Sequence, residues 1–295
     1  MAALLVDNAP AKVNLTLRVV GRRADGYHEL ESLVAFADVC DGLSLAPGGE
    51  LSLRVHGPRA AAAGDDADNL VLKAARALAA RVEGLTLGHF TLDKQLPVAA
   101  GLGGGSADAA AGLRLLARAN GLSPDDARLG EAARATGADV PVCLDPRPRL
   151  MRGVGEILSA PLPLPPLPVV LVNPGVALST GAVFAGWTEA AHAPPFDLDA
   201  AANAASREEL LQLLSRYAND LEPAASTLAP AVGEALAALR GLTDCRLARM
   251  SGSGATCFAL FPSAAAAIAG AEALRGKYPQ WWARATKLGE RAPAA

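Results

Sequence analysis

A glycine-rich segment, PVAAGLGGGSADAA (97–110), carries the strongest chemical signal in the sequence. It follows an expected strand and precedes an expected helix, with Ser106 as the N-cap. Backbone amides at a helix N-terminus carry partial positive charge, and glycines let the backbone approach a phosphate closely. The segment is not a P-loop, and Ser106 stands where a dinucleotide fingerprint needs its third glycine. We expect a loop that binds a di- or triphosphate; the alternative is a flexible hinge before an alanine-rich helix.

Lys12 and Asp139 could provide charge stabilisation and proton transfer beside such a loop. Lys12 and Asn14 are two residues apart on an expected strand, so both side chains face the same way. Asp139 stands two residues before Pro141, where a turn or a helix start is expected. Phosphoryl transfer needs mainly positioning and charge stabilisation, with one carboxylate to receive the acceptor's proton. Each residue alone has a simpler interpretation, as a solvated lysine on an edge strand and as a helix cap.

Two further segments could contact a ligand. In ADGYHEL (24–30), Tyr27 and His28 could present an aromatic face and a hydrogen-bonding ring to a base, although most such pairs are simply partly buried. In SGSGATCFAL (251–260), a second glycine turn could bring backbone amides near a ligand, although an ordinary hairpin is the simpler interpretation.

The elements that must position these segments follow from periodicity and from glycine and proline. The stretch PLPLPPLP (161–168) predicts a stiff connection between two parts of the chain. Strands are expected over 12–20, 33–39, 51–57, 89–97 and 169–175, helices over 69–82, 106–122, 206–217 and 229–240, and a strand, tight turn and strand over 245–261.

Composition favours a globular protein with two lobes that share a cleft. Hydrophobic residues make up 51% of the 295 residues, and the net charge of −3 gives no reason to expect a nucleic-acid partner. The N-terminus does not resemble a secretory signal, and no long uncharged apolar run predicts a membrane span, so we expect a cytoplasmic protein with no membrane partner. The four cysteines are far apart, which predicts free thiols: Cys40, Cys143, Cys245 and Cys257.

In this order the segments resemble the kinases grouped as galactokinase, homoserine kinase, mevalonate kinase and phosphomevalonate kinase (GHMP). Within that family they are most similar to members that act on a cytidine-diphosphate-linked methylerythritol, in the non-mevalonate isoprenoid pathway. The resemblance is carried by PAKVNLTL (10–17), RRADGYHELESLV (22–34), LPVAAGLGGGSADAA (96–110), GADVPV (137–142), GVGEIL (153–158), NPGVALSTGAVF (173–184) and SGSGATCFAL (251–260).

The resemblance implies an α+β fold with two lobes around a central cleft. Residues 1–155 would form the ATP-binding and catalytic lobe, and residues 156–295 the C-terminal lobe. It implies an ATP-dependent kinase that uses Mg²⁺ and phosphorylates the 2-hydroxyl of the methylerythritol unit. The metal ligands stay open, with Asp108 as a candidate carboxylate, and so do the acceptor contacts of residues 144–152, which depart from the family pattern.

The resemblance also assigns roles to residues. Asp139 matches the base that receives the hydroxyl proton, and Lys12 the charge that orients the hydroxyl and stabilises the transferring group. Tyr27 and Phe184 match aromatic residues that sandwich the cytosine, and His28 one that hydrogen-bonds its edge. Further matches to the acceptor site are Asn14 and Thr180. Matches to the ATP site are Pro97, Val98, Ala99, Ala100, Gly101, Leu102, Gly103, Gly104, Gly105, Ser106 and Ala107, with Asn69 and Lys94 near the nucleoside pocket.

Two alternatives stay open on the sequence. A kinase of the same family that acts on homoserine or mevalonate would share the glycine loops but would not need aromatic residues for cytosine. A nucleotide sensor with the same fold would bind ATP without turning it over.

Overall fold

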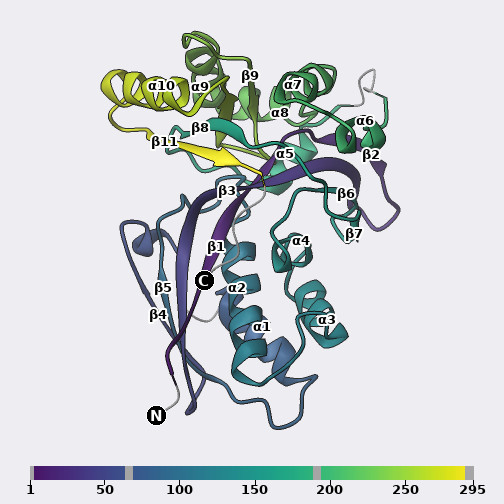
Figure 1. Ribbon diagram of the computed structural model, residues 1–295, viewed down its shortest axis with the longest axis vertical. Coiled ribbons are helices and arrows are strands. Elements are labelled where there is room, and N and C mark those ends of the chain that lie inside the picture. The colour runs from purple at the N-terminus through teal and green to yellow at the C-terminus, as the bar shows by residue number, and fades with distance from the viewer. Residues whose placement is uncertain (1–2, 64–68, 189–193, 290–295) are drawn as a thin grey trace.

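A single eleven-stranded sheet runs through the computed structural model, which describes residues 3–63, 69–188 and 194–289 (Figure 1). The strands are β1 (Leu5–Asn14), β2 (Arg18–Arg22), β3 (His28–Pro47), β4 (Ser52–His56), β5 (Gly88–Asp93), β6 (Arg149–Gly153), β7 (Ile157–Leu158), β8 (Leu167–Asn173), β9 (Leu247–Met250), β10 (Cys257–Leu260) and β11 (Trp282–Leu288). The helices are η1 (Ala60–Ala62), α1 (Leu70–Ala79), α2 (Gly104–Ala119), α3 (Ala127–Thr136), α4 (Val140–Leu144), α5 (Thr180–Ala185), α6 (Leu198–Ala202), α7 (Arg207–Ser215), α8 (Glu222–Leu228), α9 (Pro230–Arg240) and α10 (Ala264–Lys277).

The long strand β3 joins the two lobes. It pairs with β1, β2, β5 and β6, and its residue Ala37 pairs with Leu288 of β11, which belongs to the C-terminal part of the sheet. The main path of the sheet is β4–β5–β3–β11–β8–β10–β9. The pair β4–β5 is parallel and is connected through α1, as parallel strands require a crossover. The two lobes therefore share a continuous hydrogen-bonded framework.

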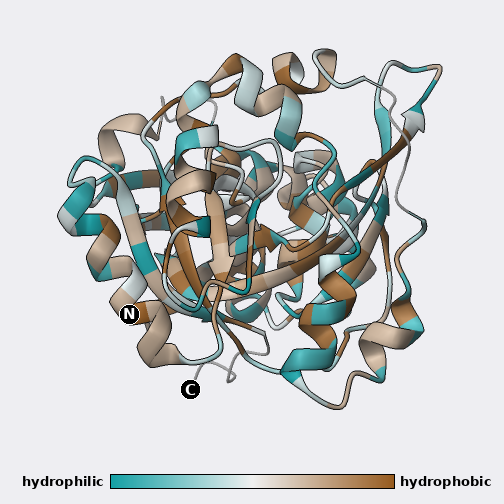
Figure 2. Cartoon of the chain, turned by 90° about the horizontal axis from the view of Figure 1, so that it is seen from above, coloured by the Kyte–Doolittle hydropathy of each residue, from teal (hydrophilic) through white to brown (hydrophobic). Residues whose placement is uncertain are grey.

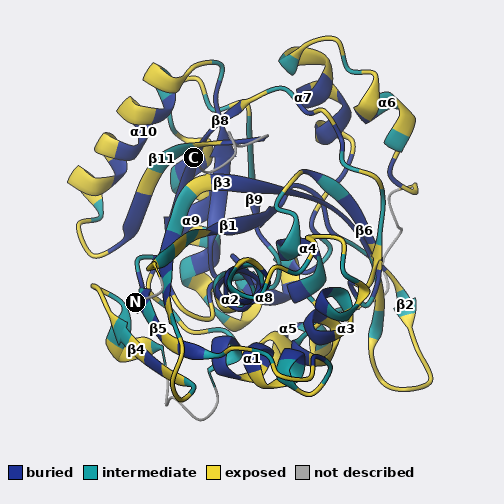
Figure 3. Cartoon of the chain, turned by 60° about the horizontal axis from the view of Figure 1, so that its bottom comes forward, coloured by how far each residue is buried: buried dark blue, intermediate teal, exposed yellow. Residues whose placement is uncertain are grey.

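In the N-terminal lobe, α2 packs against β1 and β3, and α1, α3 and α4 pack around α2 (Figure 1). The apolar side chains of α1 recur at helical spacing, and Val71, Ala75 and Leu78 are buried against α2. Alanines dominate the buried face of α2, which lets neighbouring elements approach closely. The strands β1 and β3 are correspondingly among the most buried parts of the chain (Figure 3).

Helices cover both faces of the sheet in the C-terminal lobe. On one face, α6 and α7 pack over β8, β10 and β11, and four leucines of α7 are buried there. On the other face, α8, α9 and α10 pack against the alternate side chains of the same strands. Hydrophobic residues accordingly concentrate on the central strands, and hydrophilic ones on the outer turns of the helices (Figure 2).

Several predicted boundaries were wrong, among them those of the strand expected over 33–39, which is only the middle of β3. The strand expected over 12–20 breaks after Asn14, because the next amides bond to Leu33 O and the chain then pairs with residues 218–220. The strand expected over 89–97 ends at Asp93. The helix expected to start with Ser106 as its cap instead has Gly103 as the N-cap, so Ser106 lies in its first turn.

The predicted helices, the C-terminal hairpin and the free thiols were confirmed. Helices occupy the cores of the four predicted ranges, and 245–261 forms a strand, turn and strand. All four cysteines are free. The lobe boundary at 155/156 stays a prediction; it falls in the turn between β6 and β7, which pair with each other. In the described ranges, no helix combines the length and the apolar character needed to cross a membrane.

Candidate active site

A cavity of about 940 Å³ lies where the two lobes meet and is lined by segments that are far apart in the sequence. The end of β1, the turn between β2 and β3, and the start of α2 contribute to it, together with the residue before α4. The C-terminal lobe adds α5 and the turn after β9. Residues from every segment that the sequence singled out are therefore brought together in one place.

The start of α2 forms one wall of this cavity. Gly103 has φ +60° and no side chain caps the helix, so the first-turn amides of Gly104, Gly105 and Ser106 keep their N–H groups available. All four of these residues line the cavity. Gly103 also lies against Lys12, where a Cβ would come within 3.1 Å of the lysine Cε. The loop therefore offers aligned backbone donors to an anion, and the positive φ and the close approach of Lys12 both favour glycine at residue 103.

Lys12 and Asp139 form an ion pair inside the cavity. Their Nζ and Oδ2 atoms are 3.3 Å apart, and the Lys12 ammonium also donates to Asn14 Oδ1 at 3.1 Å. Lys12 is only 3% exposed, so it is not the solvated lysine of the simpler interpretation. Asp139 precedes α4 but makes no side-chain cap hydrogen bond, and its carboxylate is 38% exposed. Among the described residues, it is the only carboxylate that lines the cavity.

The second glycine turn ties this pair to the phosphate loop. Ser251 Oγ donates to Gly101 O at 2.8 Å and accepts from the backbone N–H of Asn14 at 3.1 Å. Thr256 N donates to Ala100 O at 3.1 Å. The turn is therefore more than an ordinary hairpin, because its atoms hold the loop and the strand that carries Lys12 in one arrangement.

Aromatic residues gather at the other end of the cavity. His28 stacks on Phe184 with ring centroids 4.9 Å apart and meets Trp187 edge to face at 5.7 Å. Tyr27 is 65% exposed and lines the cavity beside them. Burial lowers the pKa of His28, and Arg22 adds to the effect, which favours the neutral imidazole at neutral pH. Neighbouring Thr180 shares a hydrogen bond with Ser253 at 2.9 Å.

Some residues named from the sequence do not line the cavity. Leu102 and Ala107 belong to the hydrophobic cores, because their side chains point away from the loop surface. Asn69 caps α1 by accepting from Val71 N. Lys94 is buried between Asp41 and Asp108, which also removes Asp108 as a metal ligand facing the cavity. Within the glycine-rich segment, Ala99 is the first residue that lines the cavity, so Pro97 and Val98 lie outside it.

Sequence reasoning also missed several residues of the cavity wall. Arg22 stands in the segment that carried the resemblance, directly before the turn that bears Tyr27, and could have been named. Trp187 follows Phe184 at helical spacing, which is a weak signal. Met151 lies in the segment whose contacts were left open, and only tertiary structure brings it to the cavity.

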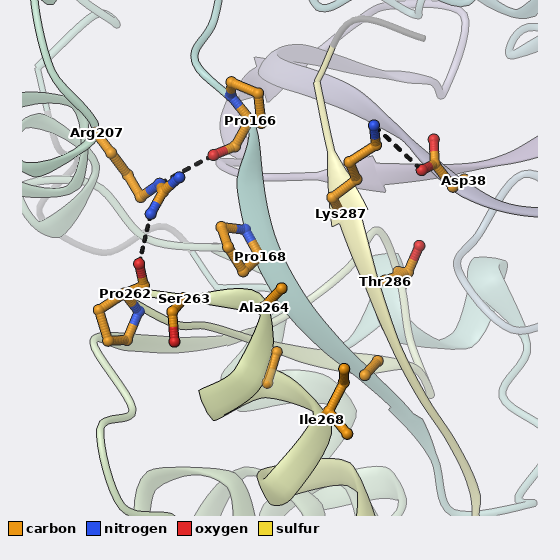
Figure 4. Close-up of a pocket in the computed structure, with 12 residues that line it drawn as sticks. Asp38, Pro166, Pro168, Arg207, Pro262, Ser263, Ala264, Ile268, Thr286 and Lys287 are labelled. Atoms are coloured by element: carbon orange, nitrogen blue, oxygen red, sulfur yellow. Dashed lines mark hydrogen bonds and ion pairs between the residues drawn. The ribbon is translucent and has the colours of Figure 1, made fainter. Parts of the chain in front are cut away.

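A second cavity of about 700 Å³ lies on the C-terminal lobe and lacks the groups for this chemistry (Figure 4). Its cations are engaged: Arg207 donates to the carbonyls of Pro166 and Pro262, and Lys287 pairs with Asp38 at 3.6 Å. Among the described residues that line it there is no glycine. The interlobe cavity is therefore the candidate active site.

Comparisons with known proteins show the family of the chain. The family descriptions "GHMP kinases N terminal domain" and "GHMP kinases C terminal" match residues 69–145 and 199–280. A 4-diphosphocytidyl-2-C-methyl-D-erythritol kinase of Methylobacterium radiotolerans is 58% identical over 291 residues, which cover 97% of this chain and 99% of that protein. The chain belongs to the GHMP kinase family. Like the other GHMP kinases it is an ATP-dependent enzyme, and it is grouped with the 4-diphosphocytidyl-2-C-methyl-D-erythritol kinases.

Solved structures of GHMP kinases show the same fold. A crystal structure of 4-(cytidine 5'-diphospho)-2C-methyl-D-erythritol kinase is 36% identical, covers 97% of this chain and 100% of its own, and has a TM-score of 0.79. The homoserine kinase of Cytophaga hutchinsonii is 20% identical, covers 98% of this chain and 96% of its own, and has a TM-score of 0.71. At 20% identity, the likeness to the homoserine kinase shows the fold alone.

Proposed function

We propose that this chain transfers the terminal phosphoryl group of ATP to the 2-hydroxyl of 4-diphosphocytidyl-2-C-methyl-D-erythritol. The names of the relatives support this acceptor. The observation that carries the proposal is that one cavity joins a phosphate loop, a lysine–aspartate pair and an aromatic cluster. A homoserine or mevalonate kinase would have no use for the cluster, and a nucleotide sensor would have no use for the pair.

In the proposed reaction, Asp139 accepts the proton of the acceptor hydroxyl. The hydroxyl oxygen forms a bond to the γ-phosphorus of ATP, the bond between that phosphorus and the bridging oxygen breaks, and ADP leaves. Lys12 keeps the carboxylate in place through their 3.3 Å ion pair and balances the negative charge that develops on the phosphoryl oxygens. Asn14 positions the ammonium by accepting from Nζ.

The aromatic cluster is proposed to bind the cytosine. Tyr27 and Phe184 offer ring faces for stacking, and neutral His28 can both donate and accept a hydrogen bond at the edge of the base. Arg22, which borders the same part of the cavity, is suited to the diphosphate of the acceptor. Thr180 would complete the acceptor site from the C-terminal lobe.

Magnesium is proposed to arrive with the nucleotide. In the described part of the chain, no group of three or more histidine, cysteine or acidic side chains could hold a metal ion. Mg²⁺ commonly binds substrate phosphates and water together with one or two carboxylates. The carboxylate of Asp139 is already engaged by Lys12 and assigned to the acceptor's proton, so the phosphates and water would supply most of the ligands. The ion would neutralise charge on the phosphates while Lys12 and the loop amides position them.

An acceptor panel tests the proposal. The enzyme, ATP and Mg²⁺ are incubated with the cytidyl compound, homoserine or mevalonate, and ADP is measured. We expect ADP formation only with the cytidyl compound. ADP formation with homoserine or mevalonate instead would reject the proposed acceptor, and no acceptor-dependent ADP at all would reject catalysis.

Replacing Tyr27 with alanine should raise the KM for the cytidyl acceptor by about ten- to a hundredfold, since stacking of one base on an aromatic ring contributes about 1–3 kcal/mol. The KM for ATP should stay within about twofold, because the phosphate loop is formed by other residues. Steady-state kinetics with each substrate varied in turn measures both constants.

The control for this variant is Tyr278→Ala, which removes a tyrosine that stacks on Trp281 outside the cavity. It should leave the KM for the acceptor unchanged. An unaltered acceptor KM in Tyr27→Ala would show that this ring does not bind the cytosine.

The division into lobes at 155/156, the cytoplasmic location and the lack of a nucleic-acid partner remain predictions.

A further inference from the structure

Two aspartates share one lysine beneath the phosphate loop. Lys94 Nζ donates to Asp41 Oδ2 and to Asp108 Oδ2, both at 2.6 Å. The three residues come from β3, the residue after β5, and α2, and each is at most 3% exposed. None of them lines the active-site cavity, so none is placed to contact the substrates of the proposed transfer.

The cluster lies against the start of α2. A Cβ on Gly104 would be 3.3 Å from Lys94 Nζ and 3.7 Å from Asp41 Oδ2. Gly103, the preceding residue, lies against Lys12. The first residues of the helix are therefore held between two lysines, one of which faces the cavity while the other is anchored below the loop.

Asp41 also holds the chain that leads to the loop. Its Oδ1 accepts from the backbone N–H groups of Gln95 and Leu96 at 2.6 and 2.8 Å. Through Lys94, the same carboxylate is connected to Asp108 in the second turn of α2. Both ends of the glycine-rich segment are thus tied to one buried network.

The charges of this network do not balance if both acids are ionised. Two carboxylates and one ammonium leave one net negative charge in a site closed to water, which is costly. Asp41 has a partner for each oxygen, whereas Asp108 Oδ1 is buried with no hydrogen-bond partner in the described structure. Asp108 is therefore the acid that is better suited to hold a proton.

We propose that Asp41, Lys94 and neutral Asp108 form a positioning network that sets the phosphate loop for ATP, with Lys94 acting through Gly104 rather than on the nucleotide. The inference rests on the nucleotide part of the proposed function. Burial, opposed by Lys94 and reinforced by Asp41, raises the pKa of Asp108 to about 7. Besides Lys94 and Asp41, the buried Cys143 is electrostatically coupled to Asp108.

Binding of ATP measured by calorimetry tests the network without needing an acceptor. Lys94→Met should weaken ATP binding by about tenfold, because the loop loses its anchor, while the acceptor KM changes less than threefold. The control Lys287→Met removes a half-exposed lysine that pairs with Asp38, and it should bind ATP like wild type. Equal ATP affinity of Lys94→Met and wild type would overturn the proposal, as would equal loss for both substrates.

Two Asp108 variants test whether this residue is neutral. They also test the positioning network if Lys94→Met does not fold. Asp108→Asn resembles the protonated acid and should bind ATP at least five times more tightly than Asp108→Leu, which has no acceptor for Lys94. Equal loss in both variants would show that the negative charge is required. If wild type bound no ATP, both the proposed function and the network would be rejected. If wild type bound ATP but the variants behaved like it, only the network would be rejected.

The pH dependence of stability gives a second readout of Asp108. A raised pKa means that the folded state gains stability from the bound proton at low pH and loses it as the pH rises from about 4 to about 7. Asp108→Asn lacks this loss. The Tm of Asp108→Asn minus the Tm of wild type should therefore be about 5 °C larger at pH 8 than at pH 5. A constant difference in Tm would contradict a protonated Asp108.

Discussion

Replacing Asp139 with asparagine should lower kcat by about 10³-fold while ATP binding persists. The carboxamide has the size of the carboxylate but cannot take the hydroxyl proton, and the described cavity wall has no second carboxylate to replace it. The phosphate loop packs against Lys12, which this variant retains, so the nucleotide should still bind. A coupled assay for ADP gives kcat, and calorimetry gives the dissociation constant of ATP.

The control for this experiment is Asp125→Asn, which changes an exposed acid before α3 and should leave kcat unchanged. A kcat of Asp139→Asn close to that of wild type would rule out Asp139 as the base. A large loss of ATP affinity with little change in kcat would assign the carboxylate to nucleotide binding instead.

Replacing Gly101 with alanine should lower kcat/KM for ATP by about 10²-fold. Gly101 has φ +73°, which strains any other residue, and its Cβ would collide with Ser251 O. The same Cβ would come within 2.9 Å of Gly254 O. Since these are backbone atoms of the second glycine turn, they cannot move aside as a flexible side chain would, and the loop itself must shift.

Gly84→Ala is the control that separates the steric clash of Gly101→Ala from the strain of a positive φ. Gly84 has φ +68° but no atom near its Cβ position, so both variants carry the same kind of strain and only one carries the clash. We expect Gly84→Ala to lose some stability and to keep its kcat/KM for ATP. Similar kcat/KM values for Gly101→Ala and wild type would show that the packing between the two glycine turns is not needed for catalysis.

Local patterns predicted much of the fold. The spacing of apolar residues in 69–82 predicted α1, and the same argument predicted α7 and α9. The break after Asn14 could not be predicted, because it depends on pairing with residues 218–220, far along the chain. The early start of α2 at Gly104 was missed because a glycine N-cap has no side chain to indicate it.

The arrangement of the site could also be predicted only in part. Lys12 and Asn14 could be placed on one face from strand alternation, and their contact was confirmed. That Asp139 reaches Lys12 depends on tertiary structure, and only the resemblance to known kinases suggested it. Lys94 was assigned to the nucleoside pocket, yet its side chain points to Asp41 and Asp108, since a buried ammonium needs carboxylate partners that sequence spacing does not show.

The hydroxyl of Ser251 has a consequence for biosynthesis. It bridges Gly101 O and Asn14 N, although it lies 150 residues after the first and 237 residues after the second. A nascent chain therefore carries both halves of the active site long before the ribosome has made the group that joins them. Catalytic competence should appear only after Ser251 has been made and has left the ribosome, and a fragment that ends before β9 should be unable to make product.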